Sequence, residues 1–257
     1  MTANRDSQPT ALVTGAARRI GRAIALALAE AGWRVAVHYH RSRDEAEALV
    51  ADIAGAGGSA AALEADLARW SETEGLIPAC GKALGAPSCL VNNASLFAED
   101  GIETLDEASW ERHLAVNLRA PVQLAQAFAG ALPEGGEGNI INIVDQRVWR
   151  LTPKFFSYTI SKAGLWTATR TLAQALAPRI RVNAIGPGPT LPSPRQSKAA
   201  FETQQRAVPL GRGAGLDEIA AAVRFILDAP SMTGQMIALD GGQHLAWKTP
   251  DIVGSDE

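Results

Sequence analysis

The sequence predicts an α/β fold: a single Rossmann-like, doubly wound parallel sheet of about seven strands with helices on both faces. Short β-branched apolar runs alternate with longer helical patterns from one end of the 257-residue chain to the other. Most of these runs are apolar at consecutive positions, which is typical of strands buried on both faces. The first run also passes through a glycine turn directly into a helical pattern.

The expected strands and helices follow one another in order. Seven apolar runs are predicted as strands: Ala11–Thr14, Arg34–Tyr39, Ala60–Ala65, Cys89–Asn92, Asn139–Val144, Ile180–Ile185 and Met236–Leu239. Six stretches have helical patterns: Ile20–Ala31, Asp44–Ala54, Glu72–Leu84, Trp110–Leu132, Tyr158–Ala177 and Asp217–Ala229. Right-handed crossovers would place these helices on both faces of one sheet. No internal repeat or low-complexity linker interrupts the pattern, so residues 1–257 are predicted to form one domain.

Glycines and prolines mark the expected ends of these elements. Gly32 and Gly55 are predicted to end the first two helices, and Pro178 to stop the fifth. The proline-rich segment Pro187–Pro194 is predicted to be a mobile loop, and residues 1–9 and 248–257 to be flexible tails.

Composition and charge exclude several classes of protein. The chain has 47% apolar and 20% charged residues, which is globular rather than disordered, and its net charge of −3 gives no signature for nucleic acid. The longest stretch without a charged residue, Ala83–Ala98, is too short and polar to span a bilayer. The N-terminus has no apolar signal region. Cys80 and Cys89 lack a metal-binding spacing, so we expect reduced thiols, no metal site and a cytoplasmic protein.

The glycine turn TGAARRIG, from Thr14 to Gly21, points to a dinucleotide. A strand, a tight turn and a helix N-terminus aim backbone N–H groups at a phosphate, and the helix dipole favours its charge. Gly15 permits the turn, and Gly21 permits close packing of the helix against the strand. The position at the first strand–helix junction favours a cofactor site over a purely structural turn.

The end of the second strand indicates which dinucleotide is bound. An NAD site usually has an acid there, which accepts a hydrogen bond from the ribose 2′-hydroxyl. This chain has His38-Tyr39-His40-Arg41-Ser42 instead. With Arg18, His38, Arg41 and Ser42 as donors, the site suits a 2′-phosphate and therefore NADPH; the alternative is a solvated basic turn. Asp66 would accept from the adenine amine, unless it is an ordinary surface aspartate.

Tyr158 and Lys162 form a candidate acid–base pair. They stand four residues apart at the start of a helical stretch, so both side chains project from one face. A tyrosine with the ordinary pKa of ~10 is a poor catalyst at neutral pH. A nearby ammonium favours the phenolate and is expected to lower that pKa.

These motifs together resemble the short-chain dehydrogenase/reductase family over nearly the whole chain. The matching segments are TGAARRIG, Asn92-Asn93-Ala94, Asn117, Tyr158–Lys162, RVNAIGPG at 181–188 and Asp240-Gly241-Gly242. The resemblance implies a seven-stranded Rossmann-like fold that usually assembles as a homotetramer. Tyr158 would be the general acid, Lys162 would lower its pKa and hold the ribose, and Asn117 would support a proton-relay water.

The resemblance also implies which residues surround NADP(H). Asn92 and Ala94 would flank the adenosine side, and the backbone of Gly186–Thr190 would meet the nicotinamide amide. The full expected cofactor site comprises Gly15, Arg18, Arg19, Ile20, Gly21, His38, Tyr39, His40, Arg41, Ser42, Asp66, Leu67, Asn93, Ala94, Ser95, Tyr158, Lys162, Pro187, Gly188 and Thr190.

Two departures from the general family pattern narrow the substrate. The middle glycine of the usual TGxxxGxG turn is Arg19, and the serine expected thirteen residues before the tyrosine is Asp145. These departures, with HYHRS and NNASLF, resemble the pteridine and dihydromonapterin reductases. By that resemblance Arg19 lies by the pyrophosphate and the pterin, Phe97 stacks on the pterin ring, and Ser95 binds its polar edge. Asp145 and Tyr158 complete the expected substrate site.

Asp145 also has a physical interpretation that needs no family. A carboxylate would repel the alkoxide that forms when a ketone is reduced, whereas reduction of a C=N bond requires a proton at nitrogen. A carboxyl–tyrosine pair suits the second reaction. The alternatives are that Asp145 only pairs with Arg147 or Lys154, that Phe97 is a core aromatic, and that Arg19 is a solvated residue at a helix start.

Other aromatic and histidine residues have structural interpretations. Trp149, Trp166 and Trp247 are expected in the core or in subunit contacts, and His113 on the surface.

Three functions remain open: an NADPH-dependent reductase of a pterin-like C=N heterocycle, a carbonyl reductase acting for instance on a 3-oxoacyl thioester, or a non-catalytic NADP-sensing protein. The intact Tyr158–Lys162 pair counts against the third, and Asp145 against the second.

Overall fold

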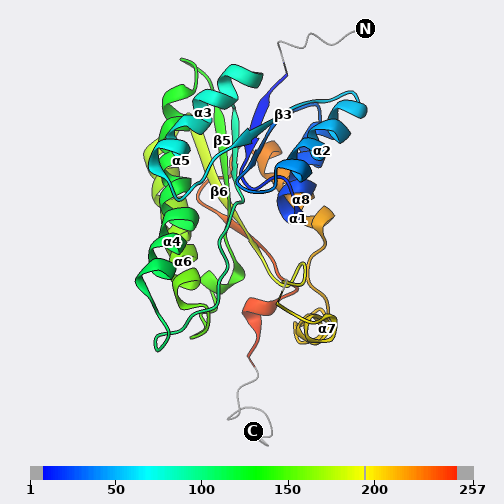
Figure 1. Cartoon of the computed structure of the whole chain (residues 1–257), viewed down its shortest axis with the longest axis vertical. Helices are drawn as coiled ribbons and strands as arrows, with labels where there is room; N and C mark the ends of the chain where they lie inside the picture. The colour runs from blue at the N-terminus through cyan, green and yellow to red at the C-terminus, as the bar shows by residue number, and fades with distance from the viewer. Residues whose placement is uncertain (1–7, 194, 248–257) are drawn as a thin grey trace, which may run out of the picture.

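A single parallel sheet of seven strands forms the centre of the protein in the computed structural model, which describes residues 8–193 and 195–247 (Figure 1). The strands are β1 (Thr10–Val13), β2 (Arg34–Tyr39), β3 (Ser59–Glu64), β4 (Cys89–Asn92), β5 (Gly138–Ile143), β6 (Ile180–Pro187) and β7 (Met236–Leu239). They lie in the order β3-β2-β1-β4-β5-β6-β7. The predicted fold class is confirmed, and each predicted strand is present to within one or two residues at its ends.

Helices cover both faces of the sheet, as expected. Figure 1 shows α1 (Arg19–Glu30), α2 (Arg43–Gly55) and α8 (Leu216–Asp228) on one face. The other face carries α3 (Trp70–Leu84), α4 (Glu107–Leu114), α5 (Ala120–Ala131) and α6 (Phe156–Leu176). Each layer buries its own cluster against the strands, the first around Ile24, Leu49 and Val223, the second around Leu76, Leu124 and Phe128. Burial of these side chains on both faces explains why the strand sequences do not alternate.

The strand order reverses between β1 and β4, which are neighbours in the sheet. Crevices at such a reversal, beyond the carboxyl ends of the strands, are where open α/β sheets bind ligands. The loops after β1, β4, β5 and β6 meet there. In Figure 1 α7 (Lys198–Arg206) lies beyond this end of the sheet, apart from both helical layers.

Several expected element boundaries are wrong. The predicted helix Trp110–Leu132 is α4 and α5 joined by a π-helical turn, η2 (Ala115–Arg119). Gly55 is the last residue of α2, and Gly57, with φ of +86°, supplies the left-handed turn that follows. Residues 8 and 9 are both bonded to Arg34: its backbone N–H donates to the Pro9 carbonyl at 2.9 Å, and its guanidinium donates to the Gln8 carbonyl at 2.8 Å. Most of the expected tails and Pro194 lie outside the described residues.

Beyond Pro187, the described residues of the expected proline-rich loop form no helix or strand, and no helix was predicted for the segment that follows it. Within the expected proline-rich loop, Leu191 and Pro192 are held through their carbonyls by Arg19, and α7 follows shortly afterwards. Among the helices described, none combines the length and the apolar character that crossing a membrane requires.

Candidate active site

A cavity of about 710 Å³ opens at the carboxyl ends of the strands. Its walls contain residues from the glycine turn, from the loops after β4 to β6, and from the start of α6. Most of the expected catalytic and substrate residues line it: Arg19, Ser95, Phe97, Asp145, Tyr158 and Lys162. Ile20, Asn93, Pro187, Gly188 and Thr190 of the expected cofactor site line it as well. Asn117 lies behind the wall, fully buried.

The glycine turn after β1 is fixed by side chains from other strands. Gly15 has φ of +60°, a conformation that favours glycine, and its N–H donates to His38 Nδ1 at 3.0 Å. Asn93 Nδ2 donates to the carbonyls of Thr14 and Gly15 at 2.9 and 3.1 Å. A Cβ on Gly21 would collide with the Gly15 carbonyl and the Asn93 side chain. The first turn of α1 therefore packs directly against the glycine turn and leaves no space for a side chain at Gly21.

His38 is part of this scaffold and presents no free donor to a phosphate. The ring is 2% exposed, and its Nε2 contacts the Ala65 carbonyl at 3.1 Å while Nδ1 accepts from Gly15. Both bonds are satisfied by the neutral imidazole with its proton on Nε2. Burial lowers the pKa of His38 to about 4, which keeps the ring neutral near pH 7. The expectation that His38 donates to a 2′-phosphate is therefore wrong in this arrangement, because both ring nitrogens are already bonded.

Two of the expected 2′-phosphate donors, Arg18 and Arg41, remain exposed near the end of β2. Arg18 lies 3.4 Å from Glu45, with its side chain 63% exposed, and Arg41 is exposed. Tyr39 donates to Glu64 at 3.2 Å. Tyr39, Ser42 and Leu67 are all largely buried.

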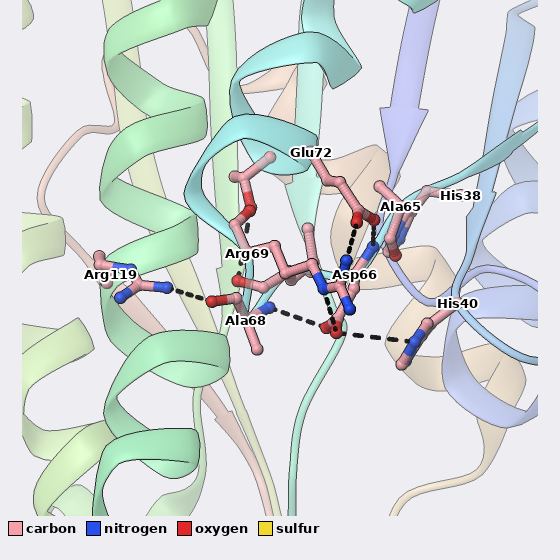
Figure 2. Close-up of polar contacts among 10 residues, drawn as sticks. His38, His40, Ala65, Asp66, Ala68, Arg69, Glu72 and Arg119 are labelled. Carbon is pink, nitrogen blue, oxygen red and sulfur yellow. Dashed lines mark hydrogen bonds and ion pairs between the residues drawn. The ribbon is translucent and has the colours of Figure 1, made fainter.

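Asp66 lies just after β3, at the edge of this region (Figure 2). Its Oδ1 accepts from the Ala68 N–H at 3.0 Å, and its backbone N–H donates to Glu72 Oε2 at 2.6 Å. Figure 2 shows His40 approaching the same carboxyl group, with Nε2 3.8 Å from Oδ2. The Ala68 N–H thus orients the Asp66 carboxyl group through Oδ1, and Oδ2 faces His40.

Arg19 adopts a backbone conformation that normally belongs to glycine. Its φ is +55°, which matches the position of the middle glycine that the general family pattern has here. Its guanidinium donates to the carbonyls of Pro192 and Leu191 at 2.9 and 3.3 Å. Arg19 therefore links the glycine turn to the loop after β6, across the mouth of the cavity.

Asp145, Tyr158 and Lys162 form a buried polar group on one wall. The Tyr158 hydroxyl donates to Asp145 Oδ2 at 2.8 Å, and Asp145 Oδ1 accepts from the backbone N–H of Arg147 at 2.8 Å. Lys162 Nζ donates to the Ile143 carbonyl at 2.7 Å and lies 5.9 Å from the Tyr158 ring. The carboxyl group thus engages the tyrosine directly, rather than only pairing with a neighbouring cation.

Burial dominates the proton affinities of this group. It raises the pKa of Asp145, and burial together with the Asp145 carboxyl raises the pKa of Tyr158 well above 10. Burial lowers the pKa of Lys162 to about 8. The expected lowering of the Tyr158 pKa is therefore wrong for this arrangement, because burial and Asp145 outweigh the opposing Arg147 guanidinium. Tyr158 remains a proton donor at neutral pH.

Aromatic side chains form the adjoining wall. The Phe97 ring stacks on Phe155 with centroids 4.4 Å apart and an interplanar angle of 10°, and its edge meets Tyr158 at 4.7 Å. Phe155 has φ of +57°, a strained conformation for a phenylalanine. Arg147 and Arg195 each lie 5.7 Å from the centre of the Phe97 ring. Phe97 is therefore a half-buried wall of the cavity rather than a core residue.

Asn117 lies in the π-helical turn and faces the loop after β4. Its Oδ1 accepts from the Leu96 N–H at 2.8 Å, and its Nδ2 donates to the Leu96 carbonyl and to Ser161 at 2.9 and 3.0 Å. Asn92, expected near the adenosine, instead donates to Asn142 at 2.8 Å inside the sheet. That expectation is wrong because alternation along β4 turns Asn92 inward and leaves Asn93 at the turn.

Sequence reasoning missed several residues of this site. His113, predicted on the surface, is fully buried and accepts from the Ala98 N–H. Phe155 and Arg195 reach Phe97 from 58 and 98 positions away, and no local pattern identifies them. Asp100 is 6% exposed and its carboxyl accepts from the Ser157 N–H in the first turn of α6. The position of Asp100 shortly after NNASLF was the sequence feature that could have indicated this capping contact.

The chain belongs to the short-chain dehydrogenase/reductase family. Residues 15–244 match the family model described as Enoyl-(Acyl carrier protein) reductase. The class of protein is therefore an oxidoreductase of this family, as the motifs predicted.

Solved structures resemble the chain closely. FolM alternative dihydrofolate reductase 1 from Brucella suis, in complex with NADP, is 55% identical, with a TM-score of 0.93 covering 97% of this chain and 100% of that one. The Brucella canis protein of the same name, complexed with NADP, is also 55% identical, with a TM-score of 0.90 covering 95% and 97%. Among curated proteins, the 3-oxoacyl-(acyl-carrier-protein) reductase of Synechocystis is 34% identical over 236 residues, 90% of this chain and 95% of that protein.

Proposed function

We propose that the protein is an NADPH-dependent reductase that transfers hydride to a pterin-like substrate, such as a dihydropterin or dihydrofolate. The observation that carries this proposal is the 2.8 Å bond from the Tyr158 hydroxyl to the carboxyl group of Asp145. Similarity to the two FolM dihydrofolate reductases, at 55% identity over nearly the whole chain, supports the same substrate class.

The residues fit NADPH as the cofactor. Helix α1 has neither a side-chain cap nor an acid in its first turn, so its N-terminal N–H groups and dipole suit a pyrophosphate. Arg41 and Arg18, near the end of β2, would hold the 2′-phosphate, and Lys162 would hold the ribose. Asp66, Asn93 and the backbone at the end of β6 and just beyond it, at Pro187, Gly188 and Thr190, complete the proposed site. When bound, the cofactor supplies the hydride.

The chain's own residues would bind the heterocycle and deliver the proton. Phe97 stacks on the ring, while Arg19 and Ser95 bind its polar edges and fix which carbon faces the cofactor. Tyr158 and Asp145 hold a proton at the Tyr158 oxygen, which the raised pKa of Tyr158 preserves at neutral pH. This proton passes to the ring nitrogen of the reduced C=N bond. Asn117 would connect the site to a relay water.

A carbonyl reductase is the second candidate. Its support is the 34% identity to 3-oxoacyl-(acyl-carrier-protein) reductases. A carboxyl group at Asp145 would repel the alkoxide that such a reaction forms, which favours the pterin-like substrate.

One substrate panel separates the two candidates. NADPH oxidation, followed by absorbance, would be measured with dihydropterins, dihydrofolate, 3-oxoacyl thioesters and sugars. The proposal expects turnover with the dihydropterin or dihydrofolate members. Brisk reduction of ketones with no turnover of any pterin would establish the carbonyl reductase instead.

We also propose that the enzyme acts as a homotetramer in the cytoplasm. Apolar side chains remain exposed on helices of both layers, including Val122 on α5, Ile160 on α6 and Phe225 on α8. Cys80 and Cys89 are buried free thiols, which suits a reducing compartment. Light scattering at micromolar concentration is expected to give four times the 27.0 kDa chain mass, and a monomeric mass would contradict this.

A further inference from the structure

His113 is a buried histidine next to the wall that carries Phe97. It is 0% exposed, near the end of α4 and one helical turn before Asn117. Its Nδ1 lies 2.8 Å from the Ser109 carbonyl, and its Nε2 accepts from the Ala98 N–H at 3.2 Å. The carbonyl accepts only, so the ring is the neutral tautomer with its proton on Nδ1.

Asn117 and His113 together form hydrogen bonds to the backbone on both sides of Phe97. Asn117 bonds the N–H and the carbonyl of Leu96, and His113 bonds the N–H of Ala98. The carbonyl of Phe97 itself accepts from Arg195 at 2.9 Å. Each of the three residues Leu96–Ala98 therefore has a backbone group bonded to a side chain from elsewhere in the chain.

The segment that contains Phe97 has no support from a sheet or a helix of its own. The structure assigns no regular element to residues 93–106, yet the Phe97 ring must keep its angle to any ring stacked on it. Ordinary loops of this kind are mobile, and a displacement of about 1 Å is enough to lower the efficiency of an enzyme strongly. Side-chain bonds from two buried residues, His113 of α4 and Asn117 of η2, supply the missing rigidity.

We propose that His113 is a positioning residue that sets the substrate-stacking angle of Phe97 through the Ala98 N–H. The inference rests on the proposed function, because it assumes that Phe97 stacks on the substrate. His113 touches neither substrate nor cofactor in this role. Its contribution is confined to substrate binding, so it acts on KM rather than on kcat or on NADPH affinity.

Two substitutions at His113 separate positioning from packing. His113→Gln can place an amide oxygen where Nε2 lies and keep the bond from Ala98, whereas the shorter side chain of His113→Asn cannot reach it. We expect His113→Asn to raise the KM for a 7,8-dihydropterin about threefold to fivefold, within the range that one lost hydrogen bond and the stacking of Phe97 allow, with kcat and the NADPH Kd unchanged. His113→Gln is expected to restore the wild-type KM to within about twofold.

Ser109→Ala is the matched control on the same helix. It removes only the hydroxyl 3.4 Å from Nδ1 and leaves the Ser109 carbonyl that holds the ring, so wild-type kinetics are expected. A wild-type KM in His113→Asn, equal impairment of the Gln and Asn variants, or a loss confined to kcat would each overturn the proposal.

Hydrogen exchange tests the inference without any substrate. The Ala98 amide of the wild-type protein is expected to exchange slowly, and its protection is expected to disappear in His113→Asn. Unprotected exchange at Ala98 in the wild-type protein would overturn the positioning role. Absence of pterin turnover with a protected Ala98 amide would instead count against the proposed function alone.

Discussion

The two halves of the candidate site are held in place by different means. On the cofactor side the glycine turn is fixed by groups on the ends of neighbouring strands, such as His38 on β2 and Asn93 after β4. On the substrate side Phe97 lies in a loop, and side chains distant in the sequence hold it: His113, Asn117 and Arg195. The sheet therefore builds the general half of the site, and loops build the half that selects a substrate.

The largest expected effect is a loss of catalysis from a substitution in the substrate half of the site, with the cofactor half left intact. Asp145→Ser is expected to lower dihydropterin reduction by roughly 10²-fold or more, because it removes the carboxyl group bonded to the Tyr158 hydroxyl. NADPH affinity should be unchanged, as measured by fluorescence titration. Asp145→Asn is the size-matched control: it can still accept from Tyr158, so a comparable loss would assign the effect to the carboxyl group's charge or proton. Unchanged pterin turnover in Asp145→Ser would contradict the mechanism.

The next effect concerns the cofactor half and the stability of the fold. The pKa of His38 is about 4 in the folded protein and 6.5 in the unfolded chain, so the unfolded state binds more protons between these values. The free energy of unfolding should therefore fall as the pH decreases from 6.5 to 4, by up to about 3 kcal/mol from this residue. His38→Asn, which keeps an acceptor for the Gly15 N–H and does not titrate, should show a smaller decrease.

Urea unfolding of both proteins at several pH values from 7 to 4 measures this difference. Carboxyl groups contribute equally to both curves, so the difference isolates His38. Parallel curves would mean that burial of the ring does not control its protonation.

A smaller effect sharpens the choice of dinucleotide. The protein is expected to bind NADPH at least tenfold more tightly than NADH, a difference of about 1.4 kcal/mol. Since His38 is buried and Arg18 lies near Glu45, Arg41 is the residue expected to carry most of this preference. Arg41→Ala should bring the two dissociation constants closer together while leaving the NADH constant unchanged. Equal constants in the wild-type protein would falsify the proposed selectivity.

The smallest effect tests the aromatic wall. Phe97→Ala should raise the KM for a dihydropterin by about twofold to tenfold, the range that stacking energies of 0.5–1.5 kcal/mol imply. Phe97→Tyr keeps a stacking ring and should retain a KM near that of the wild-type enzyme. Steady-state kinetics at saturating NADPH measure both variants. A raised NADPH Kd in Phe97→Ala would instead place the ring on the cofactor side.

Local patterns in the sequence predicted most of the fold. The strands could be recognised because burial on both faces requires consecutive apolar residues, and the glycine turn because φ of +60° at Gly15 favours glycine. The candidate pair Tyr158–Lys162 followed from helical spacing. Asp145 was recognisable as a departure from a motif, and the structure brings its carboxyl group to the Tyr158 hydroxyl.

Tertiary structure alone decided the protonation states of the site's histidine and tyrosine side chains and the hydrogen bonds that hold the site in place. Whether a histidine is a surface donor or a buried neutral acceptor depends on which chain segments surround it, and both His38 and His113 were misjudged for this reason. The raised pKa of Tyr158 arises from burial and from Asp145, thirteen positions away. Periodicity specifies which face of an element is apolar, whereas the partner of a buried polar group is set only when distant segments pack together.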